Sequence, residues 1–144
     1  MNELDLNPND FKVNEVWIVI KVNDNPIALN EGMFDLYALM DAASTYVIGQ
    51  SPAPTSLDSP PLENVNAIFM KGWDSKQKWP KKIIISYKYD LNNSFYLAAI
   101  DKRIDVKYVP TSRLKIFIEP LKNHFKNIFR AVFKQPQYTE AYKC

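Results

Sequence analysis

The chain has 144 residues, of which 47% are hydrophobic and 24% charged, and its formal net charge is +2. This length predicts a single domain, 1–144, with a buried core. No apolar run approaches the roughly 18–20 residues of a membrane-spanning helix, and the polar N-terminus lacks a secretory signal, so we expect no membrane partner. Cys144 is the single cysteine, which excludes an intrachain disulfide and favours a cytoplasmic location.

Charge is divided unevenly along the chain. Residues 1–61 carry nine acidic and two basic side chains, whereas residues 62–144 carry seven acidic and sixteen basic ones. A basic half can contact a polyanion, but a total of +2 is small beside that of typical nucleic-acid-binding proteins. We therefore expect the two halves to lie together and partly neutralise each other, and nucleic acid is not the favoured partner.

The first elements form an irregular lead-in and a central strand. Residues 1–12 are polar and are expected to be a loose lead-in to a core that covers about 13–133. Residues 15–22, EVWIVIKV, place apolar side chains on both faces of a strand, which is typical of the centre of a sheet. Turn-forming residues at 23–32 predict a long hairpin loop or a loop with some extended character.

Two further strands are expected over 33–42 and 44–50, too close together for anything but a tight antiparallel turn. Asp41 stands at this turn, and we interpret it as a turn former rather than a catalytic acid, because its side chain can accept backbone N–H bonds. Residues 51–61 hold four prolines, which predicts a loop.

Helical spacing of apolar residues then begins at Leu62. It predicts an amphipathic helix over 62–73, followed by a buried strand at 83–87. A shorter helix is expected over 90–103, with Asp90 or Asn92 as its cap, and a fifth strand over 104–109.

The longest predicted helix covers 111–133, with Pro120 either starting its main body or kinking it, and a loose tail follows over 134–144. A basic stripe at intervals of four residues lies along this helix: Lys122, Lys126, Arg130 and Lys134. We favour a solvated helix face for this stripe, and contact with a polyanion is the alternative.

The predicted order is three antiparallel strands followed by helix, strand, helix, strand and helix. Each later strand returns through a helix and so runs parallel to its neighbour, which gives an α/β fold with a five-stranded mixed sheet and helices on both faces. This order resembles the ribonuclease H-like fold. Over about residues 13–133, the segments VWIVI, LYALMDAASTYVIG, PKKIIIS and IEPLKNHFKNIF are similar to the motifs of integrase and transposase catalytic cores.

The resemblance implies three acidic side chains that hold two divalent metal ions about 4 Å apart. The corresponding positions here are Val19 in the first strand, Ser86 at the end of the fourth and Glu119 in the last helix, and only Glu119 is acidic. Valine and serine are poor ligands for a hard cation. We therefore expect a degenerate site that holds no metal or other cofactor. Asp24 and Asp90 could rebuild a Mg²⁺ or Mn²⁺ site, although turn and cap roles are favoured for both.

These inferences favour a non-catalytic ribonuclease H-like domain that acts as a binding or structural module, with a protein partner or a second copy of the chain. One alternative is a metal-dependent nuclease or strand-transfer domain that uses displaced carboxylates. Another is a nucleic-acid-binding module without chemistry. Fold alone does not decide between them, because function depends on sites.

Overall fold

The computed structural model describes residues 5–23, 26–30, 32–86 and 92–133, except for the side chains of residues 29 and 126–133. Its strands are β1 (Val16–Lys21), β2 (Ile27–Leu29), β3 (Gly32–Asp41), β4 (Val47–Pro54), β5 (Lys82–Ile85) and β6 (Asp105–Tyr108). Its helices are α1 (Leu62–Lys76), α2 (Ser94–Asp101) and α3 (Lys115–Phe133), with short 3-10 turns at Pro8–Asp10 and Thr111–Arg113.

One mixed sheet contains these strands. Strands β4, β3, β1, β5 and β6 follow one another in the predicted five-stranded order; β1 is antiparallel to β3 and parallel to β5. The short β2 lies on the same edge of β3 as β1, because Phe34 pairs with Ile27 on one edge and with Pro54 on the other. Strand β2 therefore pairs with β3 on the side where β1 pairs, further along β3. It lies in a segment that was expected to have some extended character. The predicted fold class, an α/β fold with a mixed sheet, is confirmed.

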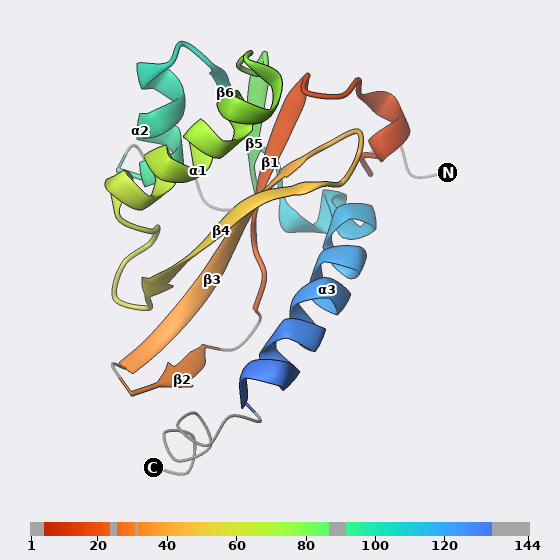
Figure 1. Cartoon of the computed structure of the whole chain (residues 1–144). Helices are drawn as coiled ribbons and strands as arrows, with labels where there is room; N and C mark the ends of the chain where they lie inside the picture. The colour runs from red at the N-terminus through yellow and green to blue at the C-terminus, as the bar shows by residue number, and fades with distance from the viewer. Residues whose placement is uncertain (1–4, 24–25, 31, 87–91, 134–144) are drawn as a thin grey trace.

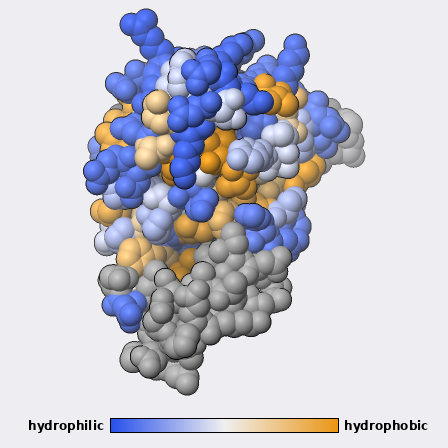
Figure 2. Space-filling model, viewed as in Figure 1, coloured by the Kyte–Doolittle hydropathy of each residue, from blue (hydrophilic) through white to orange (hydrophobic). Residues whose placement is uncertain are grey.

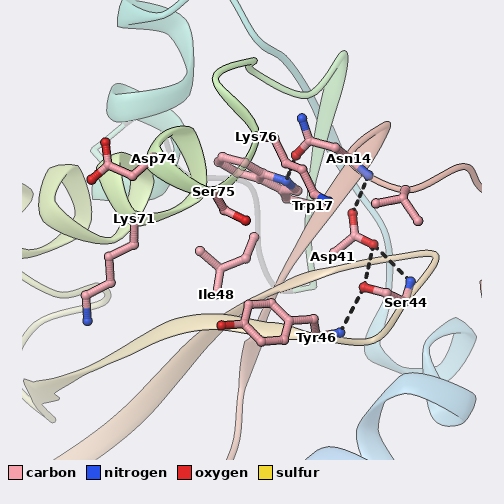
Figure 3. Close-up of a pocket in the computed structure, with 12 residues that line it drawn as sticks. Asn14, Trp17, Asp41, Ser44, Tyr46, Ile48, Lys71, Asp74, Ser75 and Lys76 are labelled. Atoms are coloured by element: carbon pink, nitrogen blue, oxygen red, sulfur yellow. Dashed lines mark hydrogen bonds between the residues drawn. The ribbon is translucent and has the colours of Figure 1, made fainter.

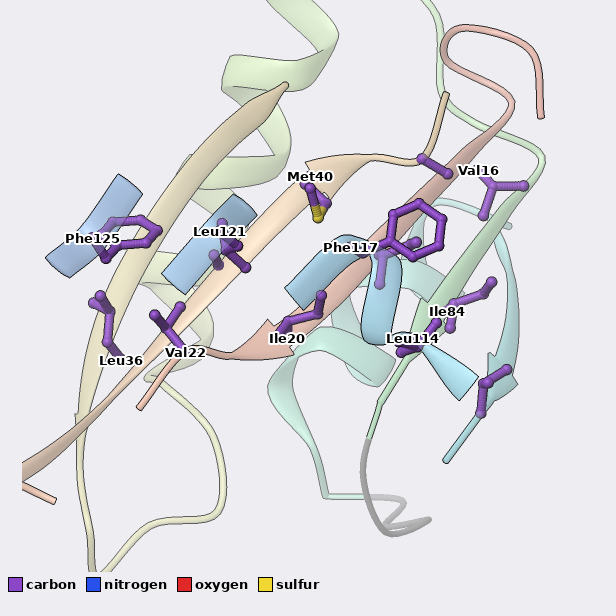
Figure 4. Close-up of a cluster of buried hydrophobic side chains, with 14 residues drawn as sticks. Val16, Ile20, Val22, Leu36, Met40, Ile84, Leu114, Phe117, Leu121 and Phe125 are labelled. Atoms are coloured by element: carbon purple, nitrogen blue, oxygen red, sulfur yellow. The ribbon is translucent and has the colours of Figure 1, made fainter. Parts of the chain in front are cut away.

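Helices cover both faces of the sheet (Figure 1), with α1 and α2 on one face and α3 on the other. Strand β1 sends Ile18 and Ile20 toward α3, and Trp17 and Val19 toward α1 and α2. All four are at most 1% exposed, as expected for a central strand with two covered faces. The cluster on the α3 side is shown in Figure 4, where Phe117, Leu121 and Phe125 pack over β1 and β3. These buried residues recur every four positions along α3.

Strand β4 differs from its prediction, since it begins at Val47 rather than 44 and continues to Pro54 through residues expected to form a loop. Leu36 of β3, which faces Pro52, accepts from Val22 N–H and donates to Asn23 Oδ1, both toward β1. The Leu36–Pro52 pair therefore makes no ladder hydrogen bond, and the proline loses nothing by lacking an N–H. Pro54, two residues further on, has the same orientation, so an edge strand accommodates both prolines.

The helices also depart from their predicted limits. Helix α1 runs three residues beyond 73, to Lys76, and α2 is shorter than predicted. The cap of α2 is Asn93, not Asp90 or Asn92, because its Oδ1 accepts from the backbone N–H groups of Phe95 and Tyr96. Pro120 lies inside α3.

Part of the expected lead-in packs on the body of the protein. Leu6 donates its N–H to the Arg113 carbonyl at 2.9 Å, and Phe11 lies 6.4 Å from Phe117 between ring centroids. On the face shown in Figure 2, hydrophilic side chains surround smaller apolar areas. No helix in the described part of the chain is long and apolar enough to span a membrane.

Candidate functional site

The strands β1 and β5 bring two of the predicted site positions together. Val19 is completely buried, and its carbonyl accepts from the N–H of Ser86 at 3.3 Å. Ser86 directly follows β5 and is 3% exposed, and its own carbonyl accepts from the Thr111 hydroxyl at 2.8 Å. The backbones of the two parallel strands thus meet as expected, but without a carboxylate at either position.

Glu119, the third predicted position, is exposed on α3. The side chain of Val19 packs on the opposite face of the sheet, among residues covered by α1 and α2, so the structure does not bring Val19 and Glu119 together. Ile20, one residue later, points to the α3 side. The resemblance places the first acid in mid-strand shortly after Trp17, which predicts the position of Val19. Successive side chains of a strand alternate between faces, so a shift of one residue changes the face. Both residues are apolar, so β1 offers no ligand on either face.

Charged residues in the two central strands are basic: Lys21 in β1 and Lys82 in β5. Across the residues that the structure describes, no group of three or more His, Cys, Asp or Glu side chains could hold a metal ion. Asp24 and Asp90, which were considered as displaced ligands, lie outside the described residues, and their placement stays a prediction.

The predicted basic stripe is described only at its start. Lys122 is half-buried on α3, beside the core residue Leu121. Lys126 and Arg130 continue the helix, but their side chains are not described, and Lys134 lies beyond the described residues. Contact between this stripe and a polyanion therefore stays a prediction.

The interpretation of Asp41 as a turn former is confirmed. Its Oδ2 accepts from the N–H of Ser44 at 2.9 Å and from the Ser44 hydroxyl at 2.8 Å, and its carbonyl accepts from Thr45 N–H at 2.9 Å. The turn is longer than predicted, since β3 ends at Asp41 and β4 begins at Val47. Thr45 has a φ of 60°, a conformation that such a turn requires.

Asp41 also holds a segment distant in sequence, which the sequence did not predict. Its Oδ1 accepts from Asn14 N–H at 2.7 Å, and the residue is only 6% exposed. Asn14, with a φ of 63°, in turn accepts from Trp17 Nε1 at 2.9 Å and donates from Nδ2 to the Lys78 carbonyl at 3.0 Å. These bonds connect the start of β1, the β3–β4 turn and the segment after α1.

A hollow of about 640 Å³ lies beside this network (Figure 3). Its lining comes from the start of β1, from the β3–β4 turn and β4, and from the second half of α1. Trp17, Tyr46 and Ile48 supply aromatic and apolar surface, and Ser75, Lys71 and Lys76 come from α1. Gly72 lets the helix approach closely, because a Cβ there would lie 2.5 Å from Cη2 of Trp17. No short motif signals this hollow, since it forms where three separate segments meet.

Comparisons with known proteins support the fold. No protein-family model and no curated protein matches the chain. Among solved structures, the chain is similar to the integrase catalytic core domain of HTLV-2 in complex with magnesium, in its dimeric form, with 12% identity, a TM-score of 0.51 and coverage of 89% of this chain and 82% of that one.

A second similar structure is a chain in the simian T-cell lymphotropic virus intasome in complex with the PP2A regulatory subunit B56 gamma. Identity is 11% and the TM-score is 0.55, over 84% of this chain. The chain spans 41% of the length of that relative. These likenesses show that the chain has the ribonuclease H-like fold of retroviral integrase catalytic cores, at low sequence identity.

Proposed function

We propose that this integrase-core-like chain is a non-catalytic binding or structural module. The observation that carries the proposal is the apolar character of β1 on both faces at the point where it meets the end of β5. Val19 and Ile20 are at most 1% exposed, and Ser86 is 3% exposed. The acids that the resemblance implies at Val19 and Ser86 are absent from the sequence.

Electrostatics support the same conclusion. Two divalent ions in a nearly dry site need several carboxylates, because burial of an uncompensated charge costs many kcal/mol. Side chains of valine, isoleucine and serine give no negative charge, and Glu119 alone is one carboxylate at an exposed position. A single carboxylate holds Mg²⁺ or Mn²⁺ weakly unless a substrate supplies further oxygen ligands.

The decisive experiment is a Mn²⁺ titration of the full chain, followed by the paramagnetic broadening of backbone amide signals, together with a nuclease assay on single- and double-stranded DNA. We expect no saturable broadening around Ser86 and no cleavage above the metal-only background. Saturable binding with cleavage that Glu119→Gln abolishes would establish the alternative of a metal-dependent nuclease or strand-transfer domain. The same assay on Asp24→Asn and Asp90→Asn would show whether displaced acids serve it.

Nucleic-acid binding without chemistry is the second candidate, favoured by the spacing of Lys122, Lys126, Arg130 and Lys134 along one helix. Affinity for DNA should be measured between 50 and 200 mM salt, because release of counterions makes phosphate contacts strongly salt-dependent. Binding that falls steeply with salt, and that Lys122→Gln with Lys126→Gln weakens further, would support this candidate. Absence of binding at 50 mM salt would exclude it.

A further inference from the structure

We infer that the hollow beside Asp41 binds a small planar aromatic molecule that carries an anionic group. Its volume of about 640 Å³ lies within the range of small-molecule pockets, roughly 300–1,000 Å³. The inference deepens the proposed binding role and rests on it, because it places the ligand at the start of β1, away from the metal positions at the end of β5.

The aromatic part of the ligand follows from the apolar lining. Tyr46 is 65% exposed although it belongs to a hydrogen-bonded turn, and Figure 3 shows its ring near Ile48, across the hollow from Trp17 and Ser75. A flat ring placed there would cover the Tyr46 ring and the side chain of Ile48 together. Aromatic pairs of this kind contribute about 0.5–1.5 kcal/mol beyond the burial of their area.

The anionic part follows from the hydrogen-bond donors that α1 contributes to the lining. Asp41 already accepts three hydrogen bonds, and both ends of the Asn14 amide are occupied. Lys71, Lys76 and the Ser75 hydroxyl make no hydrogen bond or ion pair with any residue that the structure describes. A lysine ammonium can only donate, so a ligand that satisfies these groups must offer acceptors, and a carboxylate is the simplest.

One further acid lines the hollow, but it does not oppose an anion. Asp74 extends away from Trp17 and Tyr46 in Figure 3, on the other side of the helix backbone from Ser75. The side chain of Asp41 is turned into the network of Asn14 and Ser44. Lys71 likewise extends away from Trp17 and Tyr46 in Figure 3, so Lys76, drawn beside Trp17, is the basic side chain available to a bound molecule.

The hollow is also held in shape before any ligand arrives. Asn14, Asp41 and Trp17 are joined by hydrogen bonds, and α1 is in close contact with Trp17 at Gly72. A site with fixed walls loses little conformational entropy when it binds, which favours measurable affinity even for a small molecule.

The test uses 2-naphthoate, a planar aromatic carboxylate, titrated into the full ¹⁵N-labelled chain. We expect saturable shifts confined to the Trp17 indole N–H, Ser75 and the Tyr46 amide. Ser75→Phe, at an exposed helix position, should fill the hollow and weaken binding about tenfold or more, whereas Ser56→Phe, exposed in the loop before α1, should leave it unchanged.

Two comparisons isolate the charge. The variant Lys76→Gln should weaken naphthoate binding about tenfold, the value of one charge-assisted hydrogen bond, whereas Lys107→Gln on the exposed face of β6 should not. The uncharged 2-naphthalenemethanol should bind about tenfold more weakly than the acid.

The inference is overturned if millimolar naphthoate produces no shifts, if Ser75→Phe binds as well as the parent chain, or if the alcohol equals the acid. Circular dichroism of each variant confirms that it is folded, and Tyr46→Ala, outside any core cluster, is a second variant expected to weaken binding. Failure here leaves the Mn²⁺ and nuclease results untouched, so this inference and the proposed function are tested separately.

Discussion

The two ends of β1 differ in chemistry. Where the strand begins, Asn14, Asp41 and the Trp17 indole form a nearly buried polar network beside an open hollow. Where it ends beside β5, Val19 and Ser86 are buried, with an aliphatic side chain where the resemblance implies an acid. Strand β1 thus keeps its place in an integrase-core-like fold, while the polar groups around it lie at its start and not where it ends beside β5.

The largest effect is expected from a carboxylate introduced where β1 ends beside β5. Val19→Asp would place a charge at a position with no exposed surface, among hydrophobic side chains. We expect a loss of about 3–5 kcal/mol in the free energy of unfolding, the cost of an uncompensated buried charge. Urea unfolding with and without Mn²⁺ measures it, with Val19→Ala as the size control. A stable variant that Mn²⁺ stabilises further would show that a metal site persists there.

At the start of β1, Asp41→Ala tests the polar network of Asn14, Asp41 and Ser44. The substitution leaves Asn14 N–H and two donors of Ser44 without their acceptor, so we expect a loss of about 2–3 kcal/mol, more than a single lost cap would cost. Ser44→Ala removes one of these bonds, together with the 3.2 Å bond from Tyr46 N–H to the Ser44 hydroxyl, and is the control. Equal, small losses in both variants would mean that the Asn14 bond contributes nothing. Thermal and urea unfolding give both values.

Gly72→Ala tests the contact between α1 and Trp17. Alanine favours a helix by about 1 kcal/mol over glycine, but the new Cβ would lie 2.5 Å from the buried indole. We expect a net loss of about 1–2 kcal/mol, because overpacking of a rigid core costs more than the helix gains. Trp17→Phe supplies the double-mutant cycle: the clash should disappear in the pair. A stabilised Gly72→Ala single variant would show that α1 can shift outward freely.

The smallest effect is expected at Tyr37 of β3, which pairs with Lys21, the last residue of β1. Burial, with smaller contributions from Asp35 and Asp58, raises the pKa of Tyr37 from 10.0 to about 12. The unfolded chain therefore loses this proton first, and stability should fall as pH rises from about 10 toward 12. Tyr37→Phe should cost about 1 kcal/mol near pH 8, through the lost bond to the Asp58 carbonyl, and should flatten that fall. Parallel alkaline slopes for both chains would contradict the assignment.

Sequence reasoning succeeded where a local pattern determines structure. The apolar residues of β1 and β5 indicated strands covered on two faces, and the strand and helix order predicted the topology. The turn role of Asp41 also followed from its local sequence. The bond from Asn14 to Asp41 joins residues 27 positions apart, and the hollow needs three segments in contact, so no local pattern carries either.

The errors have physical reasons as well. Prolines normally interrupt strands, but at Pro52 the register places the missing N–H where no ladder bond is made. The sequence also leaves open which face of the sheet Val19 and Ile20 each occupy, because both faces of β1 are covered and its apolar pattern does not distinguish them.

The prolines of β4 have a consequence for how copies of this protein meet. Within the described residues β4 pairs with β3 alone, so its other side is an edge of the sheet. Pro52 and Pro54 both turn their nitrogens toward that edge, and neither can donate to an incoming strand. Strand addition at this part of the β4 edge is thereby disfavoured, which guards against intermolecular sheet growth along it.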